Sequence, residues 1–174
     1  MPERAVPVLE KAVSLLPEDR RLRAMLAEGL REEGRLDEAG TLLEELIGGF
    51  GRRRSPERAA AHLELARVRR DQGRMDEAIV QLDTASKMDP SNVRILKTLA
   101  ELARENEELD RAERAYRTLL MTVRRAGDDV VELGIGPAGA LLELSRIADS
   151  RGQDKQAEEL LESALESLAQ DDTE

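Results

Sequence analysis

The residues that could carry out chemistry are few in this chain. His62 is the only histidine, and there is no cysteine. One imidazole without a thiol excludes the common nucleophile and base pairs of acyl transfer and the usual zinc ligand shells. We therefore expect no enzymatic activity, no catalytic residue, no metal ligand and no cofactor. His62 is expected to be a packed or half-exposed structural side chain.

Three short stretches resemble binding motifs but lack part of each motif. The acids of GDDVVEL, which are Asp128, Asp129 and Glu132, do not have the spacing of a calcium loop. No strand precedes GIGP at 134–137, so Pro137 is better explained as the first residue of a helix than as part of a phosphate cradle. The arginines at 52–54 have no aromatic partners and predict an exposed loop, whose role in protein binding stays open.

The overall charge limits the class of partner. A net charge of -10 disfavours nucleic acid or an anionic membrane as the main partner, because both carry dense negative charge. The first residues, MPERAVPVLEKAV, lack the basic region and unbroken apolar run of a signal peptide, and no stretch reaches the roughly 18 apolar residues of a membrane span. We expect no membrane partner and, by default, a cytoplasmic location.

The elements that must position any site are helices. Alanine, leucine, glutamate and arginine dominate the sequence, and only Phe50 and Tyr116 are aromatic. No β-branched run is bounded by turn signals, as a strand would be. The sequence therefore predicts an all-α fold.

One turn motif occurs twice in the sequence. GRLDEAG at 34–40 has a near copy, GRMDEAI, at 73–79. The glycine would end one helix in a left-handed conformation, and the acids would begin the next, where free N–H groups and the helix dipole favour negative charge. The expected helices span about 3–15, 20–33, 57–72, 75–88, 91–105, 109–125, 138–151 and 154–169, with one more through Leu42, Leu43 and Leu46.

The alanine of each motif sets a period. The equivalent alanines are Ala5, Ala39, Ala78, Ala112 and Ala157, and before Ala112 the turn glycine is replaced by Glu107. The first and third steps between them are 34 residues, the second is 39 and the fourth is 45. The surplus falls in two glycine-rich loops, at 47–56 and 124–137, which would interrupt the helices.

With this period the chain resembles the tetratricopeptide repeat, a helix-turn-helix unit of about 34 residues that stacks into a superhelix. The family's leucine and small residue of the first helix match Leu26 and Ala27, Leu65 and Ala66, Leu99 and Ala100, and Leu144 and Ser145. Its large apolar residue of the second helix matches Leu9, Leu43, Leu82, Tyr116 and Leu161, and its closing proline matches Pro17 and Pro90. Small residues let two helices approach to the short end of the usual distance of about 8–10 Å. The HEAT and armadillo repeats, with longer periods, are the alternative.

The resemblance implies an α-α superhelix, or solenoid, of stacked antiparallel helix pairs. Its parts would be a lone second helix of a truncated repeat at 1–19, repeat 1 with a loop insertion at 20–54, repeat 2 at 55–90, repeat 3 at 91–125, a loop insertion at 126–136, and repeat 4 with a tail at 137–174. A half repeat at the start favours a segment of a longer array.

The first helices of this family line a concave groove, and the resemblance places sixteen residues of this chain in it. The candidate binding residues among them are Arg21, Glu28, Arg31, Leu63, Arg67, Arg70, Arg94, Lys97, Glu101, Arg104, Leu142 and Arg146; the other places hold Ala24, Ala60, Gly139 and Asp149. Eight of the sixteen are basic and three are acidic, although the whole chain is acidic. The resemblance thus implies a non-enzymatic scaffold that binds a protein or peptide, with arginines holding acidic groups and Leu63 and Leu142 holding an apolar side chain.

Two alternatives stay open. The arginines could instead pair with acids one turn away, as Glu28 with Arg31 or Glu101 with Arg104. The chain could also be a regulatory or self-associating segment of a larger protein, because its last helix carries several leucines without a polar cap. These leucines are Leu160, Leu161, Leu165 and Leu168.

A receptor for chaperone tails is disfavoured. The family's asparagine positions, which form a two-carboxylate clamp in chaperone-binding members, hold Glu28, Arg67 and Glu101 in this chain.

Overall fold

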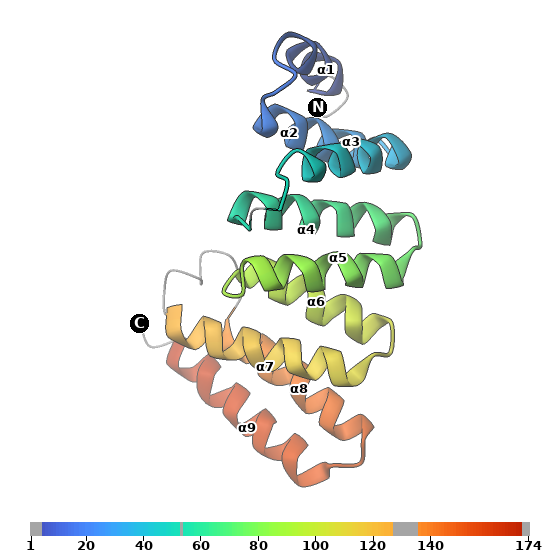
Figure 1. The fold of residues 1–174 in the computed structure, drawn as a ribbon. Coiled ribbons are helices and arrows are strands. Elements are labelled where there is room, and N and C mark those ends of the chain that lie inside the picture. Colours follow the sequence, from blue (N-terminus) through green and yellow to red (C-terminus); the bar gives the residue numbers. More distant parts are fainter. Residues whose placement is uncertain (1–4, 53, 127–135, 172–174) are drawn as a thin grey trace. The chain divides into compact units, whose positions relative to one another are not determined.

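The computed structural model describes residues 5–52, 54–126 and 136–171, and within these ranges it contains nine helices and no strand. The fold is an all-α helical repeat solenoid, as the sequence predicts (Figure 1). Asp128, Asp129 and Glu132 of the acidic loop, most of the 126–136 insertion and Arg53 lie outside the described residues. The chain forms two compact units, Met1–Pro90 and Ser91–Glu174.

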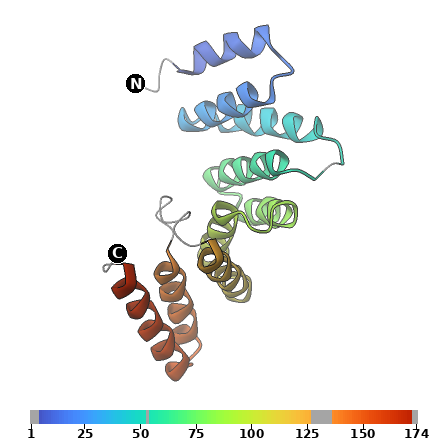
Figure 2. The same ribbon diagram turned by 90° about the vertical axis from the view of Figure 1, so that its left-hand side faces the viewer.

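The first unit contains five helices. They are α1 (Ala5–Leu15), α2 (Arg20–Glu32), α3 (Leu36–Gly48), α4 (Pro56–Asp71) and α5 (Met75–Met88). Each helix packs on the next one along the chain, and Figures 1 and 2 show α2 running antiparallel beside α3. The core joins Val6 of α1, Leu26 and Leu30 of α2, Leu43 of α3 and Leu65 of α4, all of which are buried.

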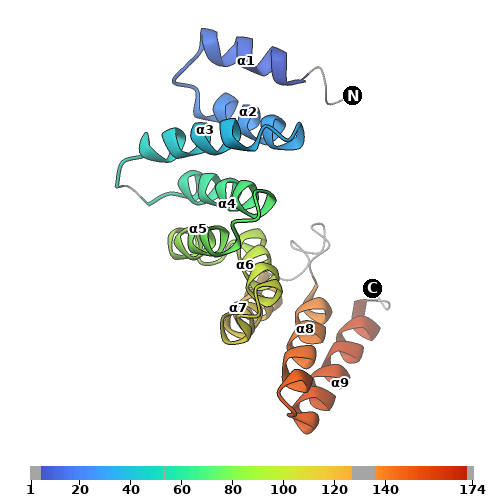
Figure 3. The same ribbon diagram turned by 90° about the vertical axis from the view of Figure 1, so that its right-hand side faces the viewer.

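The second unit contains four helices. They are α6 (Val93–Glu105), α7 (Leu109–Ala126), α8 (Pro137–Ser150) and α9 (Asp154–Asp171). α6 packs on α7, α7 on α8 and α8 on α9, and Figure 3 shows α8 and α9 side by side. Pro137 begins α8, as expected, because its missing N–H costs nothing in the first turn of a helix.

The turn inside each of the four helix pairs has the same backbone conformation, and in three of them a glycine occupies the left-handed position. Gly34, Gly73 and Gly152 have φ of 78°, 76° and 69°, which is the left-handed region that glycine adopts without strain. In each turn the residue after the glycine donates its N–H to a carbonyl five residues back, as Arg35 does to Leu30 at 2.9 Å. The glycines therefore end the first helices as predicted.

The acids that follow the turn glycine do not cap the next helix through their side chains. Asp37 and Glu38 lie in the first turn of α3, but this helix has no side-chain cap hydrogen bond. The Glu38 carboxylate accepts two hydrogen bonds from Arg35, at 2.7 and 2.8 Å, and Asp37 accepts one at 2.8 Å from Gln72, the residue after α4. These acids therefore favour the helix start through the dipole and tie it to neighbouring side chains.

The small residues expected between paired helices are buried. Ala27 and Ala39, Ala66 and Ala78, and Ala100 and Ala112 are all 0% exposed. Ser145 and Ala157, the corresponding residues of α8 and α9, are 4% and 7% exposed. Burial of both members of each pair is what closely packed helix axes require.

The same turn is strained between α6 and α7, and this strain gives the first prediction. Glu107 has φ of 60°, and it is the only non-glycine residue with positive φ in the described chain. An L-residue in this conformation costs about 1–2 kcal/mol, and glycine loses about 0.5–1 kcal/mol more backbone entropy on folding. We expect Glu107→Gly to raise the free energy of unfolding by about 0.5–1 kcal/mol, measured by urea denaturation. Gly34→Ala, the control, should lower it, and equal stability of Glu107→Gly and the wild type would contradict the prediction.

Candidate functional site

The first unit has a hollow on the side of its first helices. The α2–α4 hollow has a volume of about 920 Å³ and lies between α2, the end of α3 and the start of α4. Its wall is mainly apolar, and charged side chains stand around it. The apolar side chains are Ala24, Leu46, Phe50, Ala60 and Ala61, and the charged ones are Arg20, Arg21, Arg54, Glu57 and Glu64.

Two capped helix starts hold this hollow in place. Asp19 accepts hydrogen bonds from the N–H groups of Arg21 and Leu22, which fixes the start of α2. Ser55 accepts one from the N–H of Arg58 and so begins α4. The segment between α3 and α4 is therefore anchored at the α4 end, where Arg54 and Ser55 line the hollow.

Arg20 fixes the end of α3 in the wall of the hollow. Its Nη2 donates to the Gly49 carbonyl at 3.0 Å, and its guanidinium lies 4.5 Å from the centroid of the Phe50 ring. This is the geometry of a cation–π contact. The contact keeps an aromatic ring at a surface where a ligand can reach it.

The charged residues around the hollow differ in whether they form ion pairs. Within the described part of the chain, Arg21 and Arg54 are exposed and have no ion-pair partner. Glu64 accepts a hydrogen bond from Arg67 at 2.8 Å. Burial nevertheless raises the pKa of Glu64, because desolvation outweighs the attraction of Arg67.

Most predicted groove arginines of the first unit are held by acids. Arg31 of α2 and Arg70 of α4 both bind Asp71, at 3.0 and 2.8 Å, and Arg67 binds Glu64 of the same helix. Burial alone would raise the pKa of Asp71, but the hydrogen bonds from the two arginines outweigh it and the net shift is downward. Arg31 therefore reaches the end of α4 instead of Glu28, the partner on the same helix that the alternative offered.

Leu63 does not offer the apolar contact expected of it. Its side chain is 5% exposed, so it belongs to the packed interior. Glu28 is exposed on α2, and Arg21 is the one predicted binding residue that lines the α2–α4 hollow. Phe50 and Arg54, which the sequence pattern did not select, line the hollow, whereas Leu63 and Arg67 do not.

The predicted binding residues of the second unit also differ in whether they are held in ion pairs. Arg104 of α6 lies 3.2 Å from Glu143 of α8, which also binds Arg146 at 2.5 Å. Lys97 and Glu101 are 3.8 Å apart on α6, so Glu101 pairs with Lys97 and not with Arg104, the partner that the alternative offered. Two further predicted residues complete this set. Leu142 is half-buried, and Arg94 is exposed and has no ion-pair partner among the described residues.

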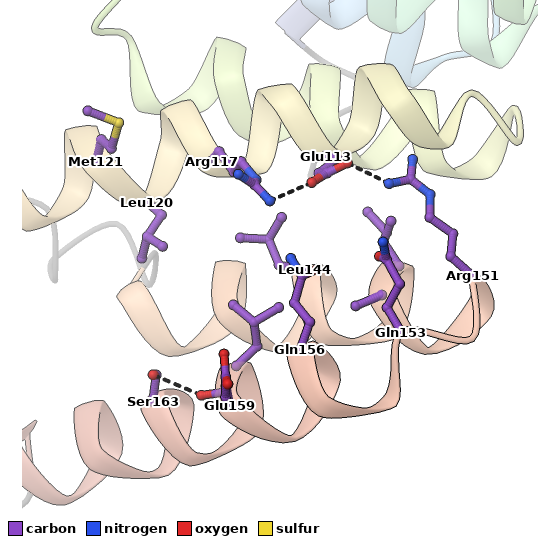
Figure 4. A pocket seen from close by; sticks show the side chains of 13 residues that line it. Glu113, Arg117, Leu120, Met121, Leu144, Arg151, Gln153, Gln156, Glu159 and Ser163 are labelled. Atoms are coloured by element: carbon purple, nitrogen blue, oxygen red, sulfur yellow. Dashed lines mark hydrogen bonds and ion pairs between the residues drawn. The ribbon is translucent and has the colours of Figure 1, made fainter.

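A second hollow, of about 460 Å³, lies between α7, α8 and α9 and was not predicted (Figure 4). Figure 4 shows Glu113 of α7 between Arg117 and Arg151, which bind it at 2.7 and 2.6 Å. The hydrogen bond from Arg151 is the main reason that the pKa of Glu113 is lowered. These three charges therefore satisfy one another, and the exposed Met121 stands at one end of the hollow.

His62 is a structural side chain, as expected. It is 7% exposed, and its Nδ1 lies 2.8 Å from Oε1 of Gln81 on α5. Across the described ranges, no group of three or more histidine or acidic side chains is arranged to hold a metal ion. None of the described helices combines the length and the apolar character needed to cross a membrane.

Comparison with known families decides what kind of repeat this is. A tetratricopeptide repeat model matches residues 1–49, 30–90 and 69–130, and a second model with the same description matches residues 140–174. The chain belongs to the tetratricopeptide repeat family. The HEAT and armadillo alternatives are thereby set aside. Tetratricopeptide arrays are scaffolds for protein–protein interaction, and this chain has that architecture.

Solved structures share this fold at low sequence identity. A crystal structure of MamA is 16% identical with a TM-score of 0.77, and the match covers 99% of this chain and 92% of that one. A putative kinesin light chain from Podosopora anserina is 21% identical with a TM-score of 0.75, covering 99% and 89%. YrrB, described as having an unusual peptide-binding site, is 15% identical with a TM-score of 0.67, covering 95% and 77%. No sequence among functionally curated proteins matches this chain.

His62 gives a prediction for the pH dependence of stability. Desolvation lowers the pKa of His62 below 6.5, so the unfolded chain binds its proton more readily than the folded one. The free energy of unfolding should therefore decrease as the pH falls below about 6.5 toward the folded pKa. We expect His62→Gln to reduce this slope between pH 7.5 and 5.5 in urea denaturation. An identical slope in both proteins would show that His62 contributes nothing to it.

Proposed function

We propose that this tetratricopeptide scaffold binds an acidic segment of a partner protein on its first-helix face, with the α2–α4 hollow as the main contact. One observation carries this proposal: an apolar hollow bordered by Arg21 and Arg54, two exposed arginines without ion-pair partners in the described chain. Binding, and not catalysis, is the proposed role.

The chemistry of recognition follows from the two kinds of surface. Arginine guanidinium groups bind carboxylates through paired, charge-assisted hydrogen bonds, which are about twice as strong as neutral ones. An aliphatic or aromatic side chain next to the carboxylate would enter the hollow and cover Leu46 and the Phe50 ring. Polar groups then orient the segment, and burial of apolar surface supplies most of the affinity.

The ion pairs of the fold restrict which arginines can act in this way. Arg31, Arg67 and Arg70 already neutralise Asp71 and Glu64. A ligand would have to replace these contacts, and the gain from doing so is small. The proposed binding residues are therefore Arg21 and Arg54. In the second unit, Arg94 of α6 is the predicted groove cation that forms no ion pair among the described residues.

Selection from a displayed peptide library against the immobilised chain tests this function. We expect enriched peptides to combine carboxylates with an apolar side chain and to lose at least about tenfold in affinity for Arg21→Glu/Arg54→Glu, because two charge-assisted contacts become repulsive. Arg114→Glu changes an exposed arginine on α7 and should leave affinity unchanged. Enriched peptides that bind the double variant as tightly as the wild type would refute the proposal.

Self-association is the second candidate function. It is favoured by apolar side chains exposed on both terminal helices, such as Val8 and Leu15 on α1 and Leu165 on α9, which are 67%, 71% and 67% exposed. Light scattering over a range of concentrations tests it, because association would raise the apparent mass with concentration.

A further inference from the structure

α9 carries an apolar stripe that no described helix covers. The α9 stripe consists of Leu161, Leu165 and Leu168, whose exposed fractions are 43%, 67% and 47%. The side of the helix adjoining the stripe is packed, since Ala157 and Ala164 are 7% and 1% exposed. Three large side chains in one row, one and two turns apart, form a contiguous apolar surface.

The same positions are buried in two other second helices, α3 and α7. Counted from the small residue at the helix start, Leu161 corresponds to Leu43 of α3 and to Tyr116 of α7, and Leu168 corresponds to Val123 of α7. Leu43, Tyr116 and Val123 are 0%, 3% and 2% exposed. The next first helix packs on each of these second helices, α4 on α3 and α8 on α7. In these two places, therefore, the element that packs on the surface of a second helix is another α-helix.

In both helix contacts, α4 on α3 and α8 on α7, a basic side chain from the first helix binds an acid on the second helix. Arg69 of α4, which is 9% exposed, binds Glu44 of α3, and Arg151 at the end of α8 binds Glu113 of α7 at 2.6 Å (Figure 4). Both arginines reach back to a carboxylate on the second helix that they cover. An acid at this edge of a second helix is therefore a receptor for an arginine of the incoming helix.

α9 has acids at both of these positions. By the same count, Glu162 corresponds to Glu44 and Glu158 corresponds to Glu113. Both are exposed beside the α9 stripe, and neither has an ion-pair partner in the described part of the chain. The apolar and the acidic halves of the contact are therefore both present on α9.

We propose that α9 binds an amphipathic helix of a partner protein, with aliphatic residues over the α9 stripe and an arginine on Glu158 or Glu162. α4 provides the pattern of such a helix, with Leu65 and Val68 on its apolar face and Arg69 at its edge. A second copy fits less well, because two α9 helices would bring Glu158, Glu162 and Glu166 of both chains together. The apolar face of α1 is also a poor match, because it carries only Lys11 as a described cation.

The full chain and a synthetic peptide of residues 55–73, which contains α4, test the proposal. We expect saturable binding of the fluorescein-labelled peptide in an anisotropy titration. Leu165→Glu should weaken it about tenfold, because apolar contact is replaced by a charge. Glu162→Arg in the protein, or Arg69→Glu in the peptide, should each weaken it about fivefold, and the two together should restore it to within about twofold. Glu18→Arg, an exposed change on the first unit, should leave it unchanged.

Three results would overturn the proposal. They are the absence of saturable binding, an affinity that Leu165→Glu leaves unchanged, and a combination of Glu162→Arg with Arg69→Glu that fails to restore affinity. Sedimentation velocity of the chain alone provides the fourth test. A dimer that disappears in Leu165→Glu would assign the α9 stripe to a second copy instead of a partner helix. The altered residues are exposed and distinct from the α2–α4 hollow, so circular dichroism should be unchanged and failure here leaves the proposed groove untouched.

Discussion

The packing of paired helices around buried small residues is the constraint on which the rest of the structure depends. Ala66 and Ala78 are fully buried, and so are Ala27 and Ala39. Because a larger side chain at these positions would separate the helices, the pairs fix how each first helix is presented. The hollow beside α2 and α4 exists because the faces of these helices are positioned in this way.

Electrostatic pairing then decides which charges remain for a partner. The acidic chain uses many of its arginines to connect different helices, as Arg31 of α2 connects to Asp71 of α4, and Arg151 after α8 connects to Asp110 and Glu113 of α7. Exposed pairs of this kind add little stability one by one, but they fix the register between helices and remove cations from the binding surface. Arg21 and Arg54 are left available because neither forms an ion pair with an acid in the described part of the chain.

Gly40 shows how this pairing depends on space as well as charge. A Cβ atom at Gly40 would lie 3.2 Å from Nη1 of Arg69, which is tighter than ordinary van der Waals contact. The last glycine of GRLDEAG therefore leaves room for a nearly buried guanidinium that binds Glu44, Gln72 and Glu77. At the same place in GRMDEAI stands Ile79, which is 1% exposed and packs in the core.

The sequence predicted the elements well because their signals are local. The left-handed glycines at 34, 73 and 152, the proline at the start of α8 and the spacing of small residues each act within a few positions. The repeat boundaries themselves stay predictions. The binding surface was less predictable, because it depends on contacts between helices. Leu63 is buried, Arg31 finds Asp71 forty residues away, and Phe50 reaches the hollow from a loop that interrupts the repeat period.

The helix contact can be tested directly with two leucine substitutions on α4. Ala66 is 0% exposed, whereas Ala60 on the same helix is exposed, so Ala66→Leu and Ala60→Leu differ only in the packing they disturb. Measured by urea denaturation, Ala66→Leu should lower the free energy of unfolding by about 1–3 kcal/mol. Ala60→Leu should stay within about 0.5 kcal/mol of the wild type. Equal stability of the two variants would contradict the claim that small residues set the spacing of the helices.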